Sequence, residues 1–432
     1  MNARKTAYNI LRESERLNKY IALALDAYLS ANKISPEDKA LISTLVYGVT
    51  ERKITLDYFI SVFTKKKARE LDKEVLLILR IGMYQILYLE KIPDSAAVNE
   101  SVKLASQYAS RSKNFVNAVL RRLCREKDLL PLPSDPIERI SVESSLPKEL
   151  CLHFMKDYPD NYRDIIDLAN ARPKITLTVN TLKTTRNDLA LSLGTSGEVC
   201  KDSHRGVRLT ENIPISDFEA LKDGICYVQD EASQIAAAAL GAVPRDTVVD
   251  VCACPGGKSF FCALEMKNEG RIYSLDLHKS KLSLIESQAK RLGIDIIDVS
   301  QHDSTSARED LIGKADKVIC DLPCSGLGVL AKKPEIRHRS IKDLCDLENI
   351  QKKILDASAK YLKLGGIMIY STCTLRKAEN EDRIFSFLKE NPDFSLVPFE
   401  LGSIIASDGY ITLFPNGERD GFFIAKLIKN GK

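Results

Sequence analysis

From Gly224 onward, short apolar runs alternate with stretches of helical periodicity, and this alternation restricts the fold more than any other feature. Strands are predicted at 247–253, 272–277, 296–300, 315–320, 367–370, 395–399 and 422–428, and helices at 257–267, 279–292, 347–362 and after Arg376. Such alternation predicts a mostly parallel sheet with helices on both faces. Because ligands bind these sheets at the carboxyl ends of the strands, the loops that follow the strands are the first candidates for a site.

The N-terminal part of the chain has a different pattern. Apolar residues repeat at helical spacing through residues 1–130, and no strand pattern interrupts them. Helices are predicted near 39–49, 54–63, 73–90, 95–107 and 112–126. We therefore expect an all-helical domain over residues 1–130.

Between these two parts lies a region of mixed pattern, residues 131–223. Closely spaced prolines after Leu129 predict a linker. Helices are then predicted at 147–157, 160–170 and 186–193, and strands at 175–180, 198–201 and 206–209. This pattern fits a small α+β, RRM-like connector, and it fits equally well a lid or spacer packed on the third domain, 224–432.

Composition and charge exclude several classes of protein. The net charge of +4 on 432 residues is mild, so any nucleic-acid footprint must be local. The N-terminus has no secretory apolar segment and the 11 cysteines form no small scaffold, so we expect reduced thiols in a cytoplasmic protein. The most apolar stretch, 75–89, is interrupted by Arg80 and Gln85, which predicts a buried helix rather than a membrane span. We expect a monomer.

The sequence DVCACPGGKS (250–259) lies where the first predicted strand of the third domain turns into its helix. Gly256 and Gly257 let the backbone approach a ligand, and a helix N-terminus offers free N–H donors. Asp276 ends the next strand, where an acid typically binds the ribose of an adenosine cofactor. The dinucleotide and phosphate-loop spellings are both absent, which favours a nucleoside cofactor without phosphates. A tight turn and a helix cap at Lys279 would explain the same residues structurally.

Two cysteines follow strands that end at the same predicted edge of the sheet. Cys324 lies three residues after Asp321 in DLPCSG, and Cys373 lies in YSTCT. A free thiol is only slightly ionised at pH 7, so a nucleophilic one needs polar surroundings of this kind. Cys252 and Cys254 have no second pair nearby, so we expect no metal.

A thiolate and a methyl-donating nucleoside together suit methylation of cytosine at C5. Addition of a thiolate to C6 turns the ring into an enamine whose C5 attacks an electrophilic methyl group. An acid near N3 stabilises the developing charge. Loss of the C5 proton and elimination of the thiol then complete the reaction.

Six segments resemble the RNA 5-methylcytosine methyltransferase family of the Fmu/Sun class: VNTLK (179–183), YVQDEASQ (227–234), CACPGGKS (252–259), DLPCSGLGV (321–329), YSTCT (370–374) and PNGERDGFFIAKL (415–427). Three more resemble the NusB-like RNA-binding domain: DKALISTLVYGVTERKITLDYFI (38–60), LRIGMYQILYLEKIPDSAAVNESVKLA (79–105) and FVNAVLRRL (115–123). The resemblance covers nearly the whole chain. It implies a NusB-like domain, an RRM-like connector and a Rossmann-like methyltransferase domain that acts on 16S ribosomal RNA.

The same resemblance implies roles for individual residues. S-adenosyl-L-methionine would be bound by Cys252, Ala253, Cys254, Pro255, Gly256, Gly257, Lys258, Asp276, Asp303 and Asp321. Cys373 matches the nucleophile, Cys324 the cysteine that aids product release, and Asp321 also faces the base. Cys254, where the family often has alanine, and Leu322 in the Asp-Leu-Pro motif depart from the pattern.

Several alternatives stay open on the sequence alone. DNA methyltransferases use a Pro-Cys cysteine as the nucleophile. The opposite assignment, with Cys324 as the nucleophile and Cys373 as the cysteine that aids product release, therefore stays open. A tRNA methyltransferase of the same family differs only in its target, whereas a non-catalytic ribosome-assembly factor would have no use for both cysteines. The basic segment 332–339 is interpreted as a phosphate clamp.

Overall fold

The computed structural model describes residues 2–17, 21–211, 218–339 and 345–431 and divides the chain into two compact units. The first unit contains residues 1–170 together with Leu330–Arg339, and the second contains residues 171–329 and 340–432. The segment Leu330–Arg339 therefore packs with the N-terminal part of the chain, although it directly follows the Cys324 loop in sequence.

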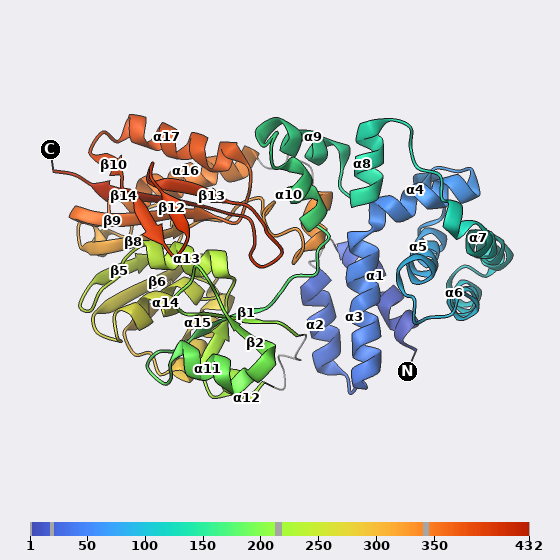
Figure 1. Cartoon of the computed structure of the whole chain (residues 1–432), viewed down its shortest axis with the longest axis horizontal. Helices are drawn as coiled ribbons and strands as arrows, with labels where there is room; N and C mark the ends of the chain where they lie inside the picture. Colours follow the sequence, from blue (N-terminus) through green and yellow to red (C-terminus); the bar gives the residue numbers. More distant parts are fainter. Residues whose placement is uncertain (1, 18–20, 212–217, 340–344, 432) are drawn as a thin grey trace. The chain divides into compact units, whose positions relative to one another are not determined.

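The first unit is all-helical, as the periodicity predicts (Figure 1). Its helices are α1 (Ala3–Leu17), α2 (Ile21–Ala31), α3 (Pro36–Glu51), α4 (Lys53–Thr64), α5 (Lys73–Tyr88), α6 (Asp94–Tyr108), α7 (Lys113–Glu126), α8 (Pro136–Ser144), α9 (Lys148–Asp157) and α10 (Tyr162–Leu168). Helix α5 contacts α1, α3, α4, α6 and α7, which explains why most of its side chains are apolar and buried. Its Arg80 is bidentate to Asp57 at 2.7 and 2.9 Å, so the charge within the core is paired. Across the described ranges, no helix is long and apolar enough to cross a membrane.

The predicted linker after Leu129 contains a helix, so this prediction is wrong in part. Helix α8 begins at Pro136, and the Asp135 side chain accepts a hydrogen bond from the Glu138 N–H at 2.7 Å. An aspartate N-cap followed by proline at the first helical position is a helix-start signal. The prolines here start a helix rather than prevent one.

Arg337, in the segment 330–339, is buried in the first unit with 1% exposure. The segment forms a short 3-10 helix, η7 (Pro334–His338), that packs against α3. The Arg337 guanidinium donates to the carbonyls of Glu51 and Ala169 at 3.0 and 2.9 Å, and to Asn170 Oδ1 at 2.8 Å. The interpretation of this segment as a phosphate clamp is therefore wrong for Arg337, because its donors are used inside the unit.

The second unit contains a small antiparallel sheet of the predicted α+β type. Strands β1 (Thr176–Val179), β2 (Gly197–Val199), β3 (Gly206–Leu209) and β4 (Cys226–Val228) pair in the order β2-β3-β1-β4, and helix α11 (Arg186–Leu193) contacts β2 and β3. Helix α12 (Glu219–Lys222) precedes β4. Strand β4 lies beyond residue 223 and still pairs with β1, so the small sheet extends into the sequence of the following domain.

The large sheet has eight strands, in the order β10-β14-β9-β8-β5-β6-β7 with β13 beside β14. The strands are β5 (Thr247–Asp250), β6 (Arg271–Asp276), β7 (Ile297–Gln301), β8 (Ala315–Asp321), β9 (Leu362–Thr372), β10 (Phe394–Leu396), β13 (Tyr410–Leu413) and β14 (Phe422–Lys429), and β11 (Phe399–Leu401) pairs separately with β12 (Ile404–Ala406). Strands β5 to β9 are parallel, and β14 runs antiparallel to β9. The order reverses between β5 and β8, so the carboxyl ends of these strands form the switch point at which ligands bind.

Helices cover both faces of the large sheet (Figure 1). They are α13 (Glu231–Ala239), α14 (Gly257–Glu265), α15 (Lys279–Leu292), α16 (Cys345–Ala359) and α17 (Glu381–Glu390). One apolar core contains Ile235 of α13, Phe260 of α14 and Ile285 of α15, and the other contains Leu355 of α16 and Ile384 of α17. The two cores confirm the three-layer α/β arrangement.

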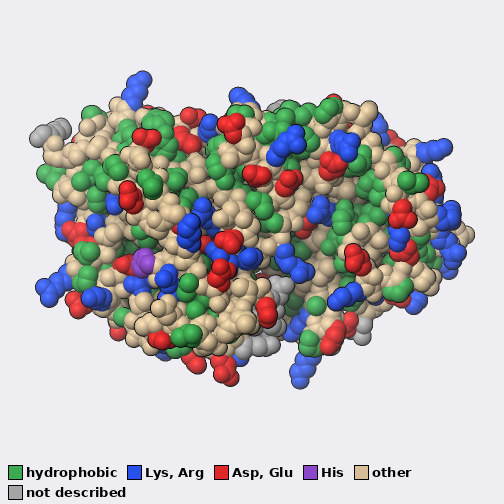
Figure 2. Space-filling view, viewed as in Figure 1, with side chains coloured by type: hydrophobic (Ala, Val, Ile, Leu, Met, Phe, Trp, Pro, Cys, Tyr) green, Lys and Arg blue, Asp and Glu red, His purple; other side chains and the backbone are tan. Residues whose placement is uncertain are grey.

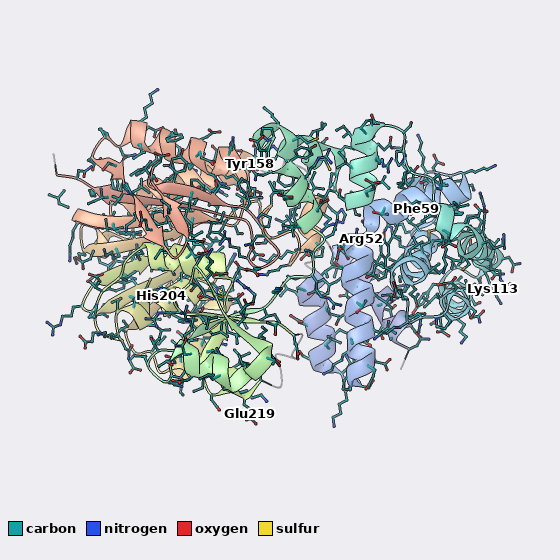
Figure 3. All side chains as sticks on the ribbon, in the orientation of Figure 1. Arg52, Phe59, Lys113, Tyr158, His204 and Glu219 are labelled. Carbon is teal, nitrogen blue, oxygen red and sulfur yellow. The ribbon has the colours of Figure 1, made fainter. Side chains whose placement is uncertain are left out.

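Ion pairs join the small sheet to the large one within the second unit. Arg208 on β3 and Glu231 on α13 are each 3% exposed in their side chains and lie 2.6 Å apart. Arg419 in the motif PNGERDG contacts Asp202 at 2.7 Å. Figure 3 labels His204 on the loop before β3, where its Nε2 lies 2.7 Å from Glu265 Oε1 at the end of α14. The PNGERDG and YVQDEASQ motifs thus contribute to the packing of the two sheets.

Candidate active site

The turn between β5 and α14 is shaped to bring backbone close to a ligand. The Cys254–Pro255 peptide bond is cis, and Gly256 has a φ of +105°, in the left-handed region. A Cβ at Gly256 would lie 2.3 Å from the ring of Phe260, so only glycine fits there. Gly256 is also the N-cap of α14, so the free N–H groups of the first helical turn follow it directly.

The two acids predicted beside this turn occupy different surroundings. The Asp276 side chain at the end of β6 accepts hydrogen bonds from the Cys254 N–H at 3.2 Å and the His278 N–H at 2.9 Å. Asp276 therefore connects the β6 end to the glycine turn rather than capping α15 from its N-cap position. Asp303, beyond β7, is exposed and accepts from Thr305, whose hydrogen bonds lower the pKa of Asp303.

Asp250 lies beneath the turn, and burial raises its pKa to about 7. Its Oδ2 accepts from Ser259 at 2.7 Å, while its Oδ1 is buried without a hydrogen-bond partner. An unpaired buried oxygen favours the neutral acid, which agrees with the direction of the shift.

Replacing Asp250 with asparagine is expected to flatten the dependence of stability on pH. The wild-type carboxyl keeps its proton in the folded state up to about pH 7 and loses it near pH 4 when unfolded, so stability falls as pH rises through this window. Asparagine does not titrate, so the fall, at most about 1.4 kcal/mol per pH unit, should disappear. Urea unfolding at several pH values measures this, and identical slopes in both proteins would contradict the assignment.

A partly buried ion pair lies between the first turn of α14 and the end of β8. Lys258 Nζ is 2.6 Å from Asp321 Oδ2 and 2.9 Å from the hydroxyl of Ser233. Ser371 on β9 donates to Asp321 Oδ1 at 2.8 Å. The lysine also lies over the ring of Phe422, 5.1 Å from its centroid. Asp321 is consequently held from both sides, with its carboxyl 30% exposed and able to meet a substrate.

The two cysteines predicted for catalysis are in contact. Cys324 Sγ and Cys373 Sγ lie 3.3 Å apart beyond the ends of the neighbouring strands β8 and β9, and neither cysteine forms a disulfide. The hydrogen bond with Cys373, followed by burial, raises the pKa of the Cys324 thiol well above its usual range.

The structure brings Lys258, Asp321, Cys324 and Cys373 to one edge of the sheet, with the glycine turn and Asp276 on the adjoining strands β5 and β6. Two contributors, Ser233 and Ser371, were not predicted, although both lie inside motifs already noted, YVQDEASQ and YSTCT. Ser371 lies on β9, and Cys373 is the residue directly after the end of this strand. In the part of the chain that the structure describes, no three His, Cys, Asp or Glu side chains are grouped to hold a metal ion.

Three family models match successive parts of the chain. The NusB family matches residues 1–125, the ferredoxin-like domain of RsmF/B-like methyltransferases matches 146–216, and 16S rRNA methyltransferase RsmB/F matches 237–428. A probable ribosomal RNA small subunit methyltransferase B of Bacillus subtilis (strain 168) is 35% identical over 454 residues, covering 100% of this chain and 99% of its own. The chain belongs to the RsmB/F family of 16S rRNA methyltransferases. The resemblance drawn from the motifs is thereby confirmed.

Other relatives agree with this RsmB/F assignment over most of the chain. The ribosomal RNA small subunit methyltransferase B of Klebsiella pneumoniae (strain 342) is 31% identical and covers 92% of this chain and 91% of its own. Among solved structures, PH0851 has a TM-score of 0.82 at 26% identity and covers 99% of both chains. A methyltransferase homologue from Pyrococcus horikoshii has a TM-score of 0.60 at 27% identity, covering 69% of this chain and 100% of its own. The predicted order of helical domain, α+β connector and α/β methyltransferase domain is confirmed.

Proposed function

We propose that this RsmB/F member transfers a methyl group from S-adenosyl-L-methionine to C5 of a cytosine in 16S ribosomal RNA, through a covalent bond between Cys373 and C6. The contact of two thiols at 3.3 Å, beside the Lys258–Asp321 pair, is the observation that carries the proposal. A methyltransferase that acted on a nucleophilic atom would need neither thiol. C5 of cytosine is a poor nucleophile, and a thiolate that adds to C6 removes this difficulty.

The residues around the glycine turn fit a nucleoside cofactor. The cradle at Gly256 excludes a side chain and leaves the N–H groups of the first turn of α14 free, while a carboxyl at the end of β6 suits ribose hydroxyls. Residues 252–258, Asp276, Asp303 and Asp321 would hold S-adenosyl-L-methionine. Bound there, it supplies an electrophilic methyl group.

Cys373 acts as the nucleophile in this proposal. Its partner Cys324 has the raised pKa and keeps its proton, so its S–H is suited to donate to a Cys373 thiolate and stabilise it. The thiolate electron pair forms the S–C6 bond, and the ring electrons move to C5, which then takes the methyl group. Asp321, fixed by Lys258 and Ser371, faces N3 and stabilises the ring charge that develops.

Cys324 assists the second half of the reaction. After methylation a water molecule takes the C5 proton, and the electrons of the C5–H bond form the C5=C6 double bond. The S–C6 bond breaks with its electron pair returning to Cys373, whose sulfur then shares the Cys324 proton. A proton carrier 3.3 Å from the departing sulfur is well placed for this exchange. Loss of Cys324 should therefore slow release of the product more than formation of the adduct.

RNA would be bound through local groups of cations rather than through a uniform field. Figure 2 shows Lys and Arg side chains mixed with Asp and Glu over the visible face. In the first unit, exposed cations occur at the end of α4 (Lys65, Lys66, Lys67) and along α7 (Lys113, Arg121, Arg125), and Figure 3 labels Lys113. Helices α4 and α7 are in contact, so these cations suit RNA phosphates on one surface. The target base must leave its stack to reach the thiols, which favours a loop.

Transfer of radioactive methyl from S-adenosyl-L-methionine to protein-free 16S RNA, to isolated small subunits and to tRNA, followed by nucleoside analysis, tests the function. Label in 5-methylcytidine from 16S RNA, free or in the subunit, is the expected result. Label only in tRNA would overturn the substrate, and label in another nucleoside would overturn the chemistry. The Cys373→Ala protein serves as the blank.

A further inference from the structure

Glu379 is fully buried and lies outside the two loops that carry Cys324 and Cys373. It contacts residues close to each of these cysteines. It has 0% exposure and lies in the short helix η9 (Lys377–Glu379), just after β9. Its Oε2 accepts from the Ser325 N–H at 2.9 Å, next to Cys324, and from Gln351 Nε2 at 2.9 Å. Gln351 in turn donates to the Pro323 carbonyl at 3.0 Å. One carboxylate oxygen thus fixes the backbone on both sides of Cys324.

The next residue, Asn380, fixes the backbone around the second thiol. Its Oδ1 accepts from the Thr372 hydroxyl at 2.5 Å, and its Nδ2 donates to the Thr374 carbonyl at 2.9 Å. Thr372 and Thr374 flank Cys373. Asn380 is also fully buried, and its φ of −114° and ψ of −104° lie outside the helical region. Consecutive residues therefore hold the two thiol-bearing loops, one loop each.

Two further contacts bind the loops together and to this pair. The Ser325 and Thr374 hydroxyls lie 2.6 Å apart, and the Tyr370 hydroxyl donates to the Glu379 carbonyl. Arg376 Nη1 lies 3.5 Å from Glu379 Oε1, so the buried negative charge has a counter-ion. A carboxylate without such partners would be too costly to bury.

We propose that Glu379 and Asn380 are positioning residues that hold Cys324 and Cys373 at the separation required for proton exchange between the thiols. This inference rests on the proposed function for its catalytic meaning, whereas the positioning itself is a property of the free protein. The carboxylate is suited to the task because Oε2 accepts two N–H groups while Oε1 faces a guanidinium. An amide at this position would turn its NH₂ towards either Arg376 or the two donors, and alanine would leave all of them unpaired.

The direct test is the rate at which a short bifunctional thiol reagent, dibromobimane, bridges Cys324 to Cys373 in the free full-length protein. Peptide mass spectrometry identifies the bridged pair among the other cysteines. The wild type should bridge rapidly, Glu379→Gln several-fold more slowly, and Glu379→Ala and Asn380→Ala about tenfold or more slowly, because small misplacements of reacting groups have large effects on rate. Methyl transfer should fall in the same order, with the KM for S-adenosyl-L-methionine unchanged.

Glu381→Gln is the matched control, because Glu381 lies two residues away and bonds to Thr412 on β13 at 3.0 Å. It should bridge at the wild-type rate. Glu379→Gln keeps the size of the side chain and remains informative if Glu379→Ala fails to fold. Wild-type bridging in both Glu379 variants, or a wild-type protein that does not bridge, would overturn the proposal. If the Glu379 and Asn380 variants bridge more slowly than the wild type as expected, but the wild type methylates no RNA, the result contradicts the proposed function and leaves the positioning role standing.

Discussion

Replacing Cys373 with alanine is expected to lower the rate of RNA methylation by at least about a thousandfold. The substitution removes the sulfur that forms the bond to C6. The hydrogen bond to Cys373 and burial both raise the pKa of the Cys324 thiol, and burial remains in this variant, so Cys324 is a poor replacement. Binding of S-adenosyl-L-methionine should stay unchanged, since Cys373 is not among the residues proposed to hold the cofactor. Methyl transfer and calorimetric binding on the same preparation measure the two effects.

Cys320→Ala is the matched control for this loss. Cys320 lies on β8, is fully buried and contacts Met368, so its thiol is part of the core packing. Its loss should lower stability and leave methylation within a few-fold of wild type. Methylation retained by Cys373→Ala and lost in Cys324→Ala would reverse the roles of the two cysteines.

Arg337→Ala is expected to lower the free energy of unfolding of the first unit by about 3 kcal/mol or more. The guanidinium satisfies the carbonyls of Glu51 and Ala169 and the amide of Asn170, and these buried acceptors would lose their donor. Burial also lowers the pKa of Arg337 to about 10, because only neutral acceptors contact it directly. Urea unfolding of the full-length protein measures the change.

Lys333→Ala is the control, four residues earlier in the same segment and exposed. It should change stability by less than about 0.5 kcal/mol. Equal effects of the two substitutions would contradict the account of the segment 330–339. Deletion of residues 1–130 would remove the packing of this segment against α3 and the hydrogen bond to the Glu51 carbonyl, so it should lower the stability of the remaining chain.

Local patterns predicted most of the elements, and the misses have identifiable physical causes. Helices α3 to α7 and the strands of the large sheet other than β13, which was missed, follow from apolar spacing. Helix α8 was missed because its prolines were interpreted as a linker, although Asp135 and Pro136 together form a helix start. Strand β4 is short and pairs with β1, far away in sequence, so no local pattern assigns it to the small sheet.

The sequence predicted which residues form the candidate site, but not how they contact one another. The positions of Asp321, Cys324 and Cys373 after strands indicated one edge of the sheet. Their contact depends on β8 and β9 being neighbours, and strand order is a tertiary property. The burial of Arg337 could not be predicted either, because a cation among Lys332, Lys333 and Arg339 has the local pattern of a solvated surface.

The most direct test of the central claim is covalent trapping by Cys324→Ala incubated with 16S RNA or small subunits and S-adenosyl-L-methionine. A denaturing gel should show a protein–RNA species of reduced mobility, and mass spectrometry after nuclease digestion should locate a methylated cytosine on Cys373. An adduct on Cys324 in the Cys373→Ala protein would contradict the assignment of the nucleophile. Methylation by the wild type with no adduct in either variant would contradict covalent catalysis.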